Sequence, residues 1–304
     1  MRSPMDNTVY ECYKRAGAIA ADARDHGVSL IKPGVRLLDV AMQLETRIKG
    51  KGAGLAFPVN IALNTLAAHY SPRHDDTLVF KHGDVVKLDV GAHVDGYIAD
   101  TAITVEIGTH MYETMIAASS KALENAIHVL KPGAPLSEVG AVVQQTIIGY
   151  GYKPIDNLMG HGLGRFELHS GLSVPNVKGI GLNMKPKEDD VLAIEPFATN
   201  GMGHVISGEG SNIYLCSQGL KTKLVRDSKT KLLFEKMNAQ FRTLPFAERW
   251  YHERFPTSGD LGLKKLSFLG LVKQYPQLFE GKNGIVTQKE HTVIVRDHGC
   301  EVIT

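Results

Sequence analysis

The chain carries IKPGVRLLDVAMQLETRIKGKG (31–52) and, 99 residues later, LKPGAPLSEVGAVVQQTIIGYG (130–151), which align without a gap. Each stretch begins with Lys-Pro-Gly, shares Leu, Val and Ile positions with the other, and ends near a pair of glycines. Pro-Gly favours a turn, and the apolar positions that follow recur at helical spacing. Chance similarity is the alternative, since many helical hairpins have a Pro-Gly turn. We predict an internal repeat of two helix pairs, packed on one side of a shared antiparallel sheet.

Helices and strands surround the two repeats in blocks. Helical spacing of apolar residues predicts helices at 8–26, 36–49, 110–130 and 136–149. Short runs rich in β-branched residues and bounded by Gly, Pro or Asp predict strands. These runs are VNIALN (59–64), DVVKLDVGAHV (84–94), GYIADTAITVEI (96–107), VLAIEPFAT (191–199) and GIVTQKEHTVIVRD (284–297). The sequence therefore predicts an α+β fold.

A helical and basic segment interrupts this pattern. Residues 221–254 contain nine Lys or Arg against four Asp or Glu, and they include the only tryptophan, Trp250. We predict a main α+β domain formed by 1–211 and 276–304, with a helical subdomain inserted at 212–275. The excess of positive charge has two interpretations, a solvated helical face or a surface that meets a polyanion.

Composition narrows the class of protein. Of the 304 residues, 43% are hydrophobic and 22% charged, as in globular proteins, and the net charge of +2 is too small to indicate nucleic-acid binding by the whole chain. Three scattered cysteines without CxxC spacing argue against a disulfide scaffold and against cysteine-ligated zinc. The chain has neither an apolar signal segment near residue 1 nor a long apolar run. We expect a cytoplasmic protein with no membrane partner.

Three carboxylates occur inside apolar, strand-like runs, where an unpaired charge would be costly. These are Asp89, Glu195 and Glu290. With Asp100 and His161 they would form a set of oxygen and imidazole ligands suited to two divalent cations, which can acidify a shared water and polarise a carbonyl. Each residue also has an ordinary interpretation, such as a turn former or an exposed edge residue. Spacing alone leaves the two interpretations about equally favoured.

Other catalytic patterns fail. GHGLG (160–164) lacks the GK[ST] ending of a phosphate-binding loop, and the chain contains no HExxH and no GxSxG. Several further histidines, His74, His93 and His252 among them, are predicted to lie on the surface.

The motifs together resemble those of the type II methionine aminopeptidases, in order and over nearly the whole chain. The matching stretches are AFPVNIALN (56–64), AAHYSP (67–72), KLDVGAHVDGYIADTA (87–102), GHGLGRFELHSGLSVPN (160–176), AIEPFAT (193–199) and QKEHT (288–292). The resemblance implies the pita-bread fold, a pseudo-two-fold antiparallel sheet covered by two helix pairs, with an inserted helical subdomain. It also implies a cofactor of two divalent metal ions, Co, Mn, Fe or Zn.

Roles follow from the resemblance for individual residues. It implies metal ligation by Asp89, Asp100, His161, Glu195 and Glu290, with Asp100 and Glu290 bridging and Glu195 also moving a proton. It makes His69 and His169 catalytic residues that also bind the substrate, and it places Phe57 and Tyr275 at the methionine pocket. Lys289 replaces the Phe that usually precedes the bridging glutamate; strand alternation should point it away from the metals.

Two spacings favour type II over type I. His161 and His169 are eight residues apart, and the interval from Glu195 to Glu290 leaves room for the helical insertion. The long charged extension of the eukaryotic enzymes is absent, as in the archaeal form.

The resemblance implies removal of the initiator methionine from nascent polypeptides, with a small second residue preferred. We expect a monomer, with possible ribosome contact through the basic insertion. The alternatives are an X-Pro aminopeptidase or dipeptidase, and a catalytically inactive binding protein of this fold.

Overall fold

The computed structural model describes residues 4–219 and 226–304. Lys221 and Lys223, two residues of the basic segment, lie outside that part. Within it, no helix has the length and apolar character needed to cross a membrane.

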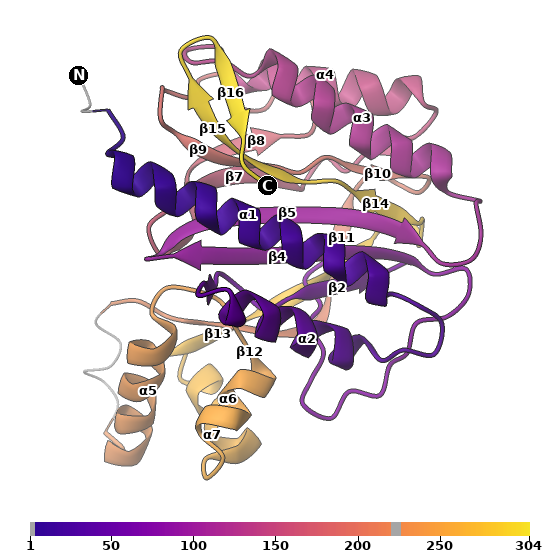
Figure 1. Cartoon of the computed structure of the whole chain (residues 1–304). Helices are drawn as coiled ribbons and strands as arrows, with labels where there is room; N and C mark the ends of the chain where they lie inside the picture. Colours follow the sequence, from indigo (N-terminus) through magenta and orange to yellow (C-terminus); the bar gives the residue numbers. More distant parts are fainter. Residues whose placement is uncertain (1–3, 220–225) are drawn as a thin grey trace.

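The first half of the chain is a layer of strands covered by two helices (Figure 1). Strands β4 and β5 form a long antiparallel hairpin, and β2 and β1 pair with β4. Helix α1 lies across β4 and β5, and α2 packs beside α1. The elements are α1 (Asn7–Leu30), α2 (Leu37–Gly50), β1 (Gly54–Leu55), β2 (Asn60–Leu63), β3 (Leu66–Ala68), β4 (Val85–Val94) and β5 (Tyr97–Glu106). A core of aliphatic side chains joins the two layers, including Leu44, Ile61 and Leu88.

The second half repeats the arrangement. Helices α3 and α4 pack on each other and cover β8 and β10. Their core contains Val143, Leu192 and Val293, all almost completely buried. The elements are α3 (Glu113–Val129), α4 (Leu136–Gly149), β6 (Lys153–Pro154), β7 (Met159–Gly164), β8 (Glu167–Pro175), β9 (Val191–Ile194), β10 (Phe197–Thr199), β14 (Val286–Gln288), β15 (His291–Arg296) and β16 (Gly299–Val302). The strands β8, β7, β9, β15 and β16 form one sheet in that order.

The predicted repeat is confirmed at the level of the backbone. Helices α2 and α4 have equal lengths and begin 99 residues apart. The glycine of each Lys-Pro-Gly turn has a left-handed φ, 82° at Gly34 and 77° at Gly133. The last glycine of each stretch does too, 79° at Gly52 and 85° at Gly151. Glycine adopts this conformation without steric cost, which explains why the repeat keeps it at these positions.

The predicted helical segment is held between two paired strands. Strands β11 (Val205–Cys216) and β13 (Val272–Glu280) pair with each other over most of their length, and β13 also pairs with β3. Between them lie α5 (Ser228–Phe241), β12 (Phe246–Ala247), α6 (Glu248–Arg254) and α7 (Gly259–Phe268). The helices enclose their own core around Met237, Tyr251 and Leu266, and Figure 1 shows them at one end of the molecule. Helices α5, α6 and α7 lie inside the 212–275 segment. The proposed boundaries of that segment fall within strands β11 and β13.

A buried ion pair attaches this helical segment to α2. The guanidinium of Arg249 donates to Glu45, and both residues are less than 10% exposed. Arg249 also donates to Ser71 Oγ at 2.8 Å, and Trp250 Nε1 donates to the second oxygen of Glu45 at 2.7 Å. Arg249 is one of the nine basic residues of 221–254, and because it is buried it does not belong to a solvated helical face.

Arg249→Ala should lower the free energy of unfolding by about 3–5 kcal/mol, because it leaves Glu45 as an uncompensated buried charge. Chemical denaturation measures this loss. Arg254→Ala, on the exposed side of the same helix, is the control and should change stability by no more than about 0.5 kcal/mol. Equal effects of the two substitutions would contradict the assigned role of the buried pair.

Candidate metal centre

A tight hairpin fixes the positions of Asp89 and Asp100. Strands β4 and β5 are joined by the two-residue turn Asp95-Gly96, where φ is 51° and 89°. Two positive φ values are typical of a type I′ turn, whose twist matches that of paired strands. The resulting register pairs Asp89 with Ala102 and Gly91 with Asp100. Because side chains alternate along a strand, the two aspartates lie diagonally on the same face. Their spacing of eleven residues is thus a consequence of this turn.

His161 lies in the middle of β7, with a glycine on each side. The strand runs between β8 and β9, and His161 pairs with Ser173 and Ala193. A Cβ atom at Gly160 would lie 2.2 Å from Ala193 O, and one at Gly162 would lie 1.9 Å from Ser170 O. Only glycine allows backbones to approach so closely. The glycines of GHGLG therefore serve strand packing, and the segment is not a phosphate-binding loop.

Glu195 and Glu290 lie at breaks between strands, which differs from the continuous strands that we expected. Strand β9 ends before Glu195, and Pro196, which has no N–H to donate, separates it from β10. Glu290 lies between β14 and β15, and its N–H donates to Ala102 O at 3.0 Å. Ala102 is also the partner of Asp89. This junction between the two halves brings carboxylates from both of them together.

The sequence-predicted residues meet at one cavity of about 70 Å³. All nine line it, together with Ala68, Leu168, Ile213, Pro245 and Gln288. Ligand atoms of Asp100, His161 and Glu290 lie within 4.8 Å of one another, and His161 Nε2 is 3.8 Å from Asp100 Oδ2. Residues as far apart in the sequence as Phe57 and Glu290 therefore form a single site.

Four carboxyl groups repel one another in this site. Burial, and then the charges of Asp89 and Glu195, raises the pKa of Asp100 well above its usual value. Burial and the neighbouring carboxylates also raise the pKa of Glu290. Burial raises the pKa of Asp89 to about 7. Burial and the charge of Asp89 raise the pKa of Glu195. Keeping all four ionised at neutral pH requires a positive charge among them.

The donor set fits divalent cations. Oδ1 of Asp89 and Oδ1 of Asp100 are buried and have no hydrogen-bond partner in the described part of the chain. His161 Nδ1 lies 3.3 Å from the carbonyl of Gly162. A carbonyl can only accept, so this contact places the proton on Nδ1 and leaves the lone pair of Nε2 for a metal. Burial lowers the pKa of His161 to about 3, which keeps the imidazole neutral as a ligand must be.

His69 and His169 reach the cavity from different strands. His69 follows β3 with a left-handed φ of 63°, and its Nδ1 lies 3.2 Å from the carbonyl of Pro276. Burial lowers the pKa of His69 to about 4, so its ring is neutral, with the proton on Nδ1 and a lone pair on Nε2. His169, on β8, packs edge-on against His161 with ring centroids 4.4 Å apart and is exposed to solvent.

Aromatic and aliphatic side chains form the remaining wall. Phe57 is 4% exposed and lies directly over Gly91, where a Cβ atom would come within 2.1 Å of its ring. Tyr275 on β13 packs edge-on against His69 at 5.2 Å. Ile213 and Pro245 complete the wall. These last two and Tyr275 come from the 212–275 segment, so that segment builds part of the site as well as covering it.

Gln288 is a site residue that the sequence analysis missed. Its Nε2 donates to Glu195 Oε2 at 3.3 Å and to Glu290 Oε2 at 3.4 Å, and the residue is 3% exposed. The signal was its position two residues before Glu290, which puts both side chains on one face. Lys289, which lies between Gln288 and Glu290, is not among the described residues that line the cavity, in agreement with the predicted outward direction.

Comparison with known proteins shows the family of the chain. The model of metallopeptidase family M24 matches residues 11–223. The methionine aminopeptidase of Methanocaldococcus jannaschii is 45% identical over 295 residues, covering 97% of this chain and 98% of the relative. The methionine aminopeptidase of Archaeoglobus fulgidus is 42% identical and covers 99% of this chain and 100% of the relative.

Solved structures share the fold at low sequence identity. A methionine aminopeptidase from Thermotoga maritima superposes with a TM-score of 0.73 at 23% identity, covering 100% of this chain and 99% of that one. A thermophilic Arx1 gives 0.85 at 16% identity, covering 98% and 91%. A prolidase from Pyrococcus furiosus gives 0.61 at 18% identity, but only 65% of its chain is covered. The predicted pita-bread fold is confirmed, and the chain belongs to metallopeptidase family M24.

Proposed function

We propose that this protein removes the initiator methionine from new polypeptides by hydrolysing the first peptide bond. The observation that carries the proposal is the single cavity that holds five metal-ligand side chains, two further histidines and an apolar wall. The names of relatives that align over nearly their full length support it.

The five ligand residues would hold two divalent ions. These residues are Asp89, Asp100, His161, Glu195 and Glu290, and the carboxylates of Asp100 and Glu290 would be shared by both ions. When bound, such ions lower the pKa of a shared water toward about 7 and polarise the substrate carbonyl. The donor set of carboxylates and one imidazole is compatible with Co, Mn, Fe or Zn.

Glu195 is the proposed proton carrier. It takes a proton from the attacking water and gives it to the leaving amine. Gln288 donates to Glu195 at 3.3 Å and holds its carboxylate toward the cavity. Because the same amide also reaches Glu290, Gln288 is a positioning residue that sets the separation of the two glutamates.

The two further histidines have different proposed roles because their hydrogen bonding differs. His69 already donates through Nδ1 to Pro276, so its Nε2 can accept a hydrogen bond from a peptide N–H. Within residues 4–219 and 226–304 no hydrogen bond holds the ring of His169, which can donate to the charge that develops on the carbonyl oxygen. His69 therefore orients the substrate, and His169 acts mainly on the transition state.

Phe57→Ala should raise KM for methionyl peptides while leaving the metal content of the enzyme unchanged. Phe57 contributes apolar surface to the pocket wall, and truncation of such a side chain costs a few kcal/mol at most. Steady-state kinetics and metal analysis of the purified variant check this. Unchanged kinetics would exclude Phe57 from the methionine pocket.

Hydrolysis of three peptides tests the function. Met-Ala-Ser should be cleaved, and Met-Lys-Ser should be cleaved poorly, because the resemblance implies that a small second residue is preferred. Cleavage of Ala-Pro instead would favour an X-Pro peptidase. Absence of any hydrolysis in protein reloaded with each candidate metal would favour an inactive binding protein.

The remaining proposals concern the setting of the reaction. We propose a cytoplasmic monomer that meets nascent chains at the ribosome through the basic residues of the insertion. The proposed contacts are Lys221, Lys223, Arg226, Lys229 and Lys231, of which the first two lie outside the described residues, and Lys231 lies 3.9 Å from Glu235. Reversing Arg226, Lys229 and Lys231 to Glu should reduce co-sedimentation with ribosomes at low salt and leave short-peptide hydrolysis intact. Unchanged co-sedimentation would identify an ordinary solvated face.

A further inference from the structure

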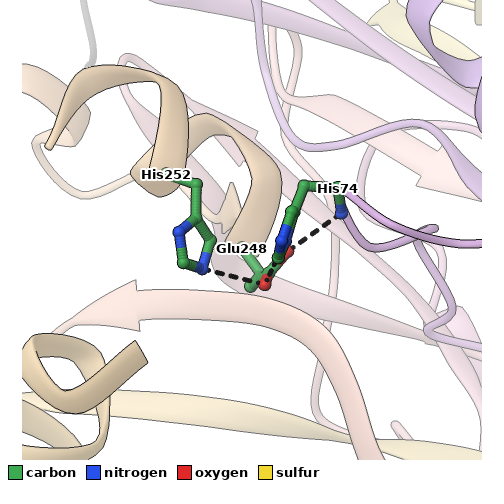
Figure 2. Close-up of side chains that lie close together, drawn as sticks. All are labelled: His74, Glu248 and His252. Carbon is green, nitrogen blue, oxygen red and sulfur yellow. Dashed lines mark hydrogen bonds and ion pairs between the residues drawn. The ribbon is translucent and has the colours of Figure 1, made fainter. Parts of the chain in front are cut away.

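A second group of metal-ligating side chains lies where α6 meets the loop after β3. His74 lies in that loop, and Glu248 and His252 are one turn apart on α6 (Figure 2). Their ligand atoms lie within 4.8 Å of one another. We expected His74 and His252 to be surface residues; the side chain of His74 is 42% exposed, whereas that of His252 is only 19% exposed and that of Glu248 only 6%. Helical spacing of i and i+4 places these two side chains on one face of α6.

One carboxylate oxygen faces both imidazoles. Glu248 Oε1 is 2.8 Å from His74 Nδ1 and 3.0 Å from His252 Nε2 (Figure 2). The other oxygen accepts a hydrogen bond from the backbone N–H of His74 at 3.2 Å. The backbone thus fixes the orientation of the carboxylate and leaves Oε1 between the two rings.

The surroundings of the Nε2 atom of His252 indicate that a cation binds there. This nitrogen is buried and forms no hydrogen bond of normal geometry with any residue in 4–219 or 226–304. Nevertheless a second carboxylate oxygen, Asp260 Oδ1 at the start of α7, lies 2.8 Å from it. A buried ring nitrogen between two carboxylate oxygens needs a cation beside it, either a proton or a metal ion.

We infer that His74, Glu248 and His252 form a structural zinc site, completed by Asp260 or a water. Two imidazoles with one or two carboxylates are a ligand set that Zn²⁺ takes in tetrahedral geometry. Zinc bonds of about 2.0–2.1 Å separate neighbouring ligand atoms by about 3.3 Å. The two separations from Glu248, 2.8 and 3.0 Å, are shorter than this by only a few tenths of an ångström, and the ligand nitrogens of the two histidines lie within 4.8 Å of each other.

The surroundings allow an ion to enter. A groove of about 390 Å³ is lined by His74, His252 and Asp260 and opens to solvent. The guanidinium of Arg73 lies 3.9 Å from Glu248 Oε1, but its side chain is 46% exposed and also contacts Asp75, so it can withdraw. The ion would join three segments, the loop that begins at His69, α6 and α7, and would attach the helical insertion to the loop that carries a proposed catalytic residue.

Zinc content and thermal stability test this site in the full-length enzyme. The protein is treated with chelator, reloaded with Zn²⁺ and freed of excess ion. Because the catalytic centre also takes zinc, the comparison is between wild type and His252→Gln. The matched control is His110→Gln, which removes an exposed histidine that is paired with Glu113 but belongs to no group of metal-ligating side chains found among the described residues.

Wild type and His110→Gln should retain about one more zinc ion per chain than His252→Gln, and added zinc should raise their Tm further. His252→Gln should still hydrolyse Met-Ala-Ser when the catalytic centre is loaded. Equal zinc content and equal zinc-dependent Tm in all three proteins would overturn the proposal and leave a hydrogen-bonded ion-pair network. If His252→Gln does not fold, anomalous diffraction of zinc-soaked wild-type crystals decides: a peak between Glu248 and the two rings supports the site, and its absence overturns it.

Discussion

Asp100→Asn and Glu290→Gln should each abolish peptide hydrolysis and reduce the divalent metal that the protein retains. Both side chains are almost fully buried, and a neutral amide offers one oxygen where a bridging carboxylate offers two. Losing metal-assisted charge stabilisation costs several kcal/mol, which corresponds to a decrease in kcat of about 10³-fold or more. Single-turnover kinetics together with metal analysis measure both quantities on the same sample.

In the metal-free protein, the same two substitutions should increase stability. In the folded protein the pKa of Asp100 and of Glu290 is raised by burial and by like charge, so each ionised carboxylate destabilises the metal-free fold at neutral pH. Removing one charge should therefore raise the Tm of the chelated protein, and adding metal should reverse the order. Asp156→Asn, in the exposed pair with His204, is the control and should change neither. Two retained metals with near-normal turnover would refute the assigned bridging roles.

Local sequence patterns predicted the parts of the fold that depend on neighbouring residues. The two Lys-Pro-Gly stretches predicted α2 and α4, whereas the Asp95-Gly96 turn, which sets the register of β4 and β5, is also a local signal but was not predicted. In each case, a residue able to adopt positive φ stands where the chain turns. Such signals involve few residues and act over short distances, so they can be recognised without knowing what packs against them.

The strand breaks at Glu195 and Glu290 could not be predicted in the same way. Both residues lie in continuous apolar runs whose composition is that of a strand. Pro196 explains the first break. The second follows from pairing with Ala102, more than 180 residues away, which depends on how the two halves of the chain dock.

Side-chain partners from distant segments were the least predictable. Gln288 has no charge, and its position two residues before Glu290 gains importance only from the two glutamates that it reaches. Arg249 belonged to a basic segment by composition, yet it is buried against Glu45. The group of His74, Glu248 and His252 spans more than 170 residues and forms only when α6 docks on the loop after β3. In all three cases, tertiary contact determines the role of the residue.

His161→Ala and His169→Ala should affect the enzyme differently, although the two rings touch and are both predicted from one motif. His161 presents the lone pair of Nε2 toward Asp100, so its loss should remove metal from one of the two positions and lower activity in proportion to that loss. His169 is free to donate to the carbonyl oxygen. Removing a hydrogen-bond donor of this kind lowers kcat by about 10²–10³-fold and has little effect on ground-state binding of the substrate.

The comparison requires metal content and kcat for both variants at several metal concentrations. Excess metal should partly restore His161→Ala, because the other four ligands are still present, and it should leave His169→Ala unchanged. His169→Gln supplies a control that keeps a donor in roughly the same place, and it should recover part of kcat without altering the metal content. Equal loss of metal from the two alanine variants would show that both histidines are ligands. Restoration of His169→Ala by metal alone would remove the reason for assigning it to the transition state.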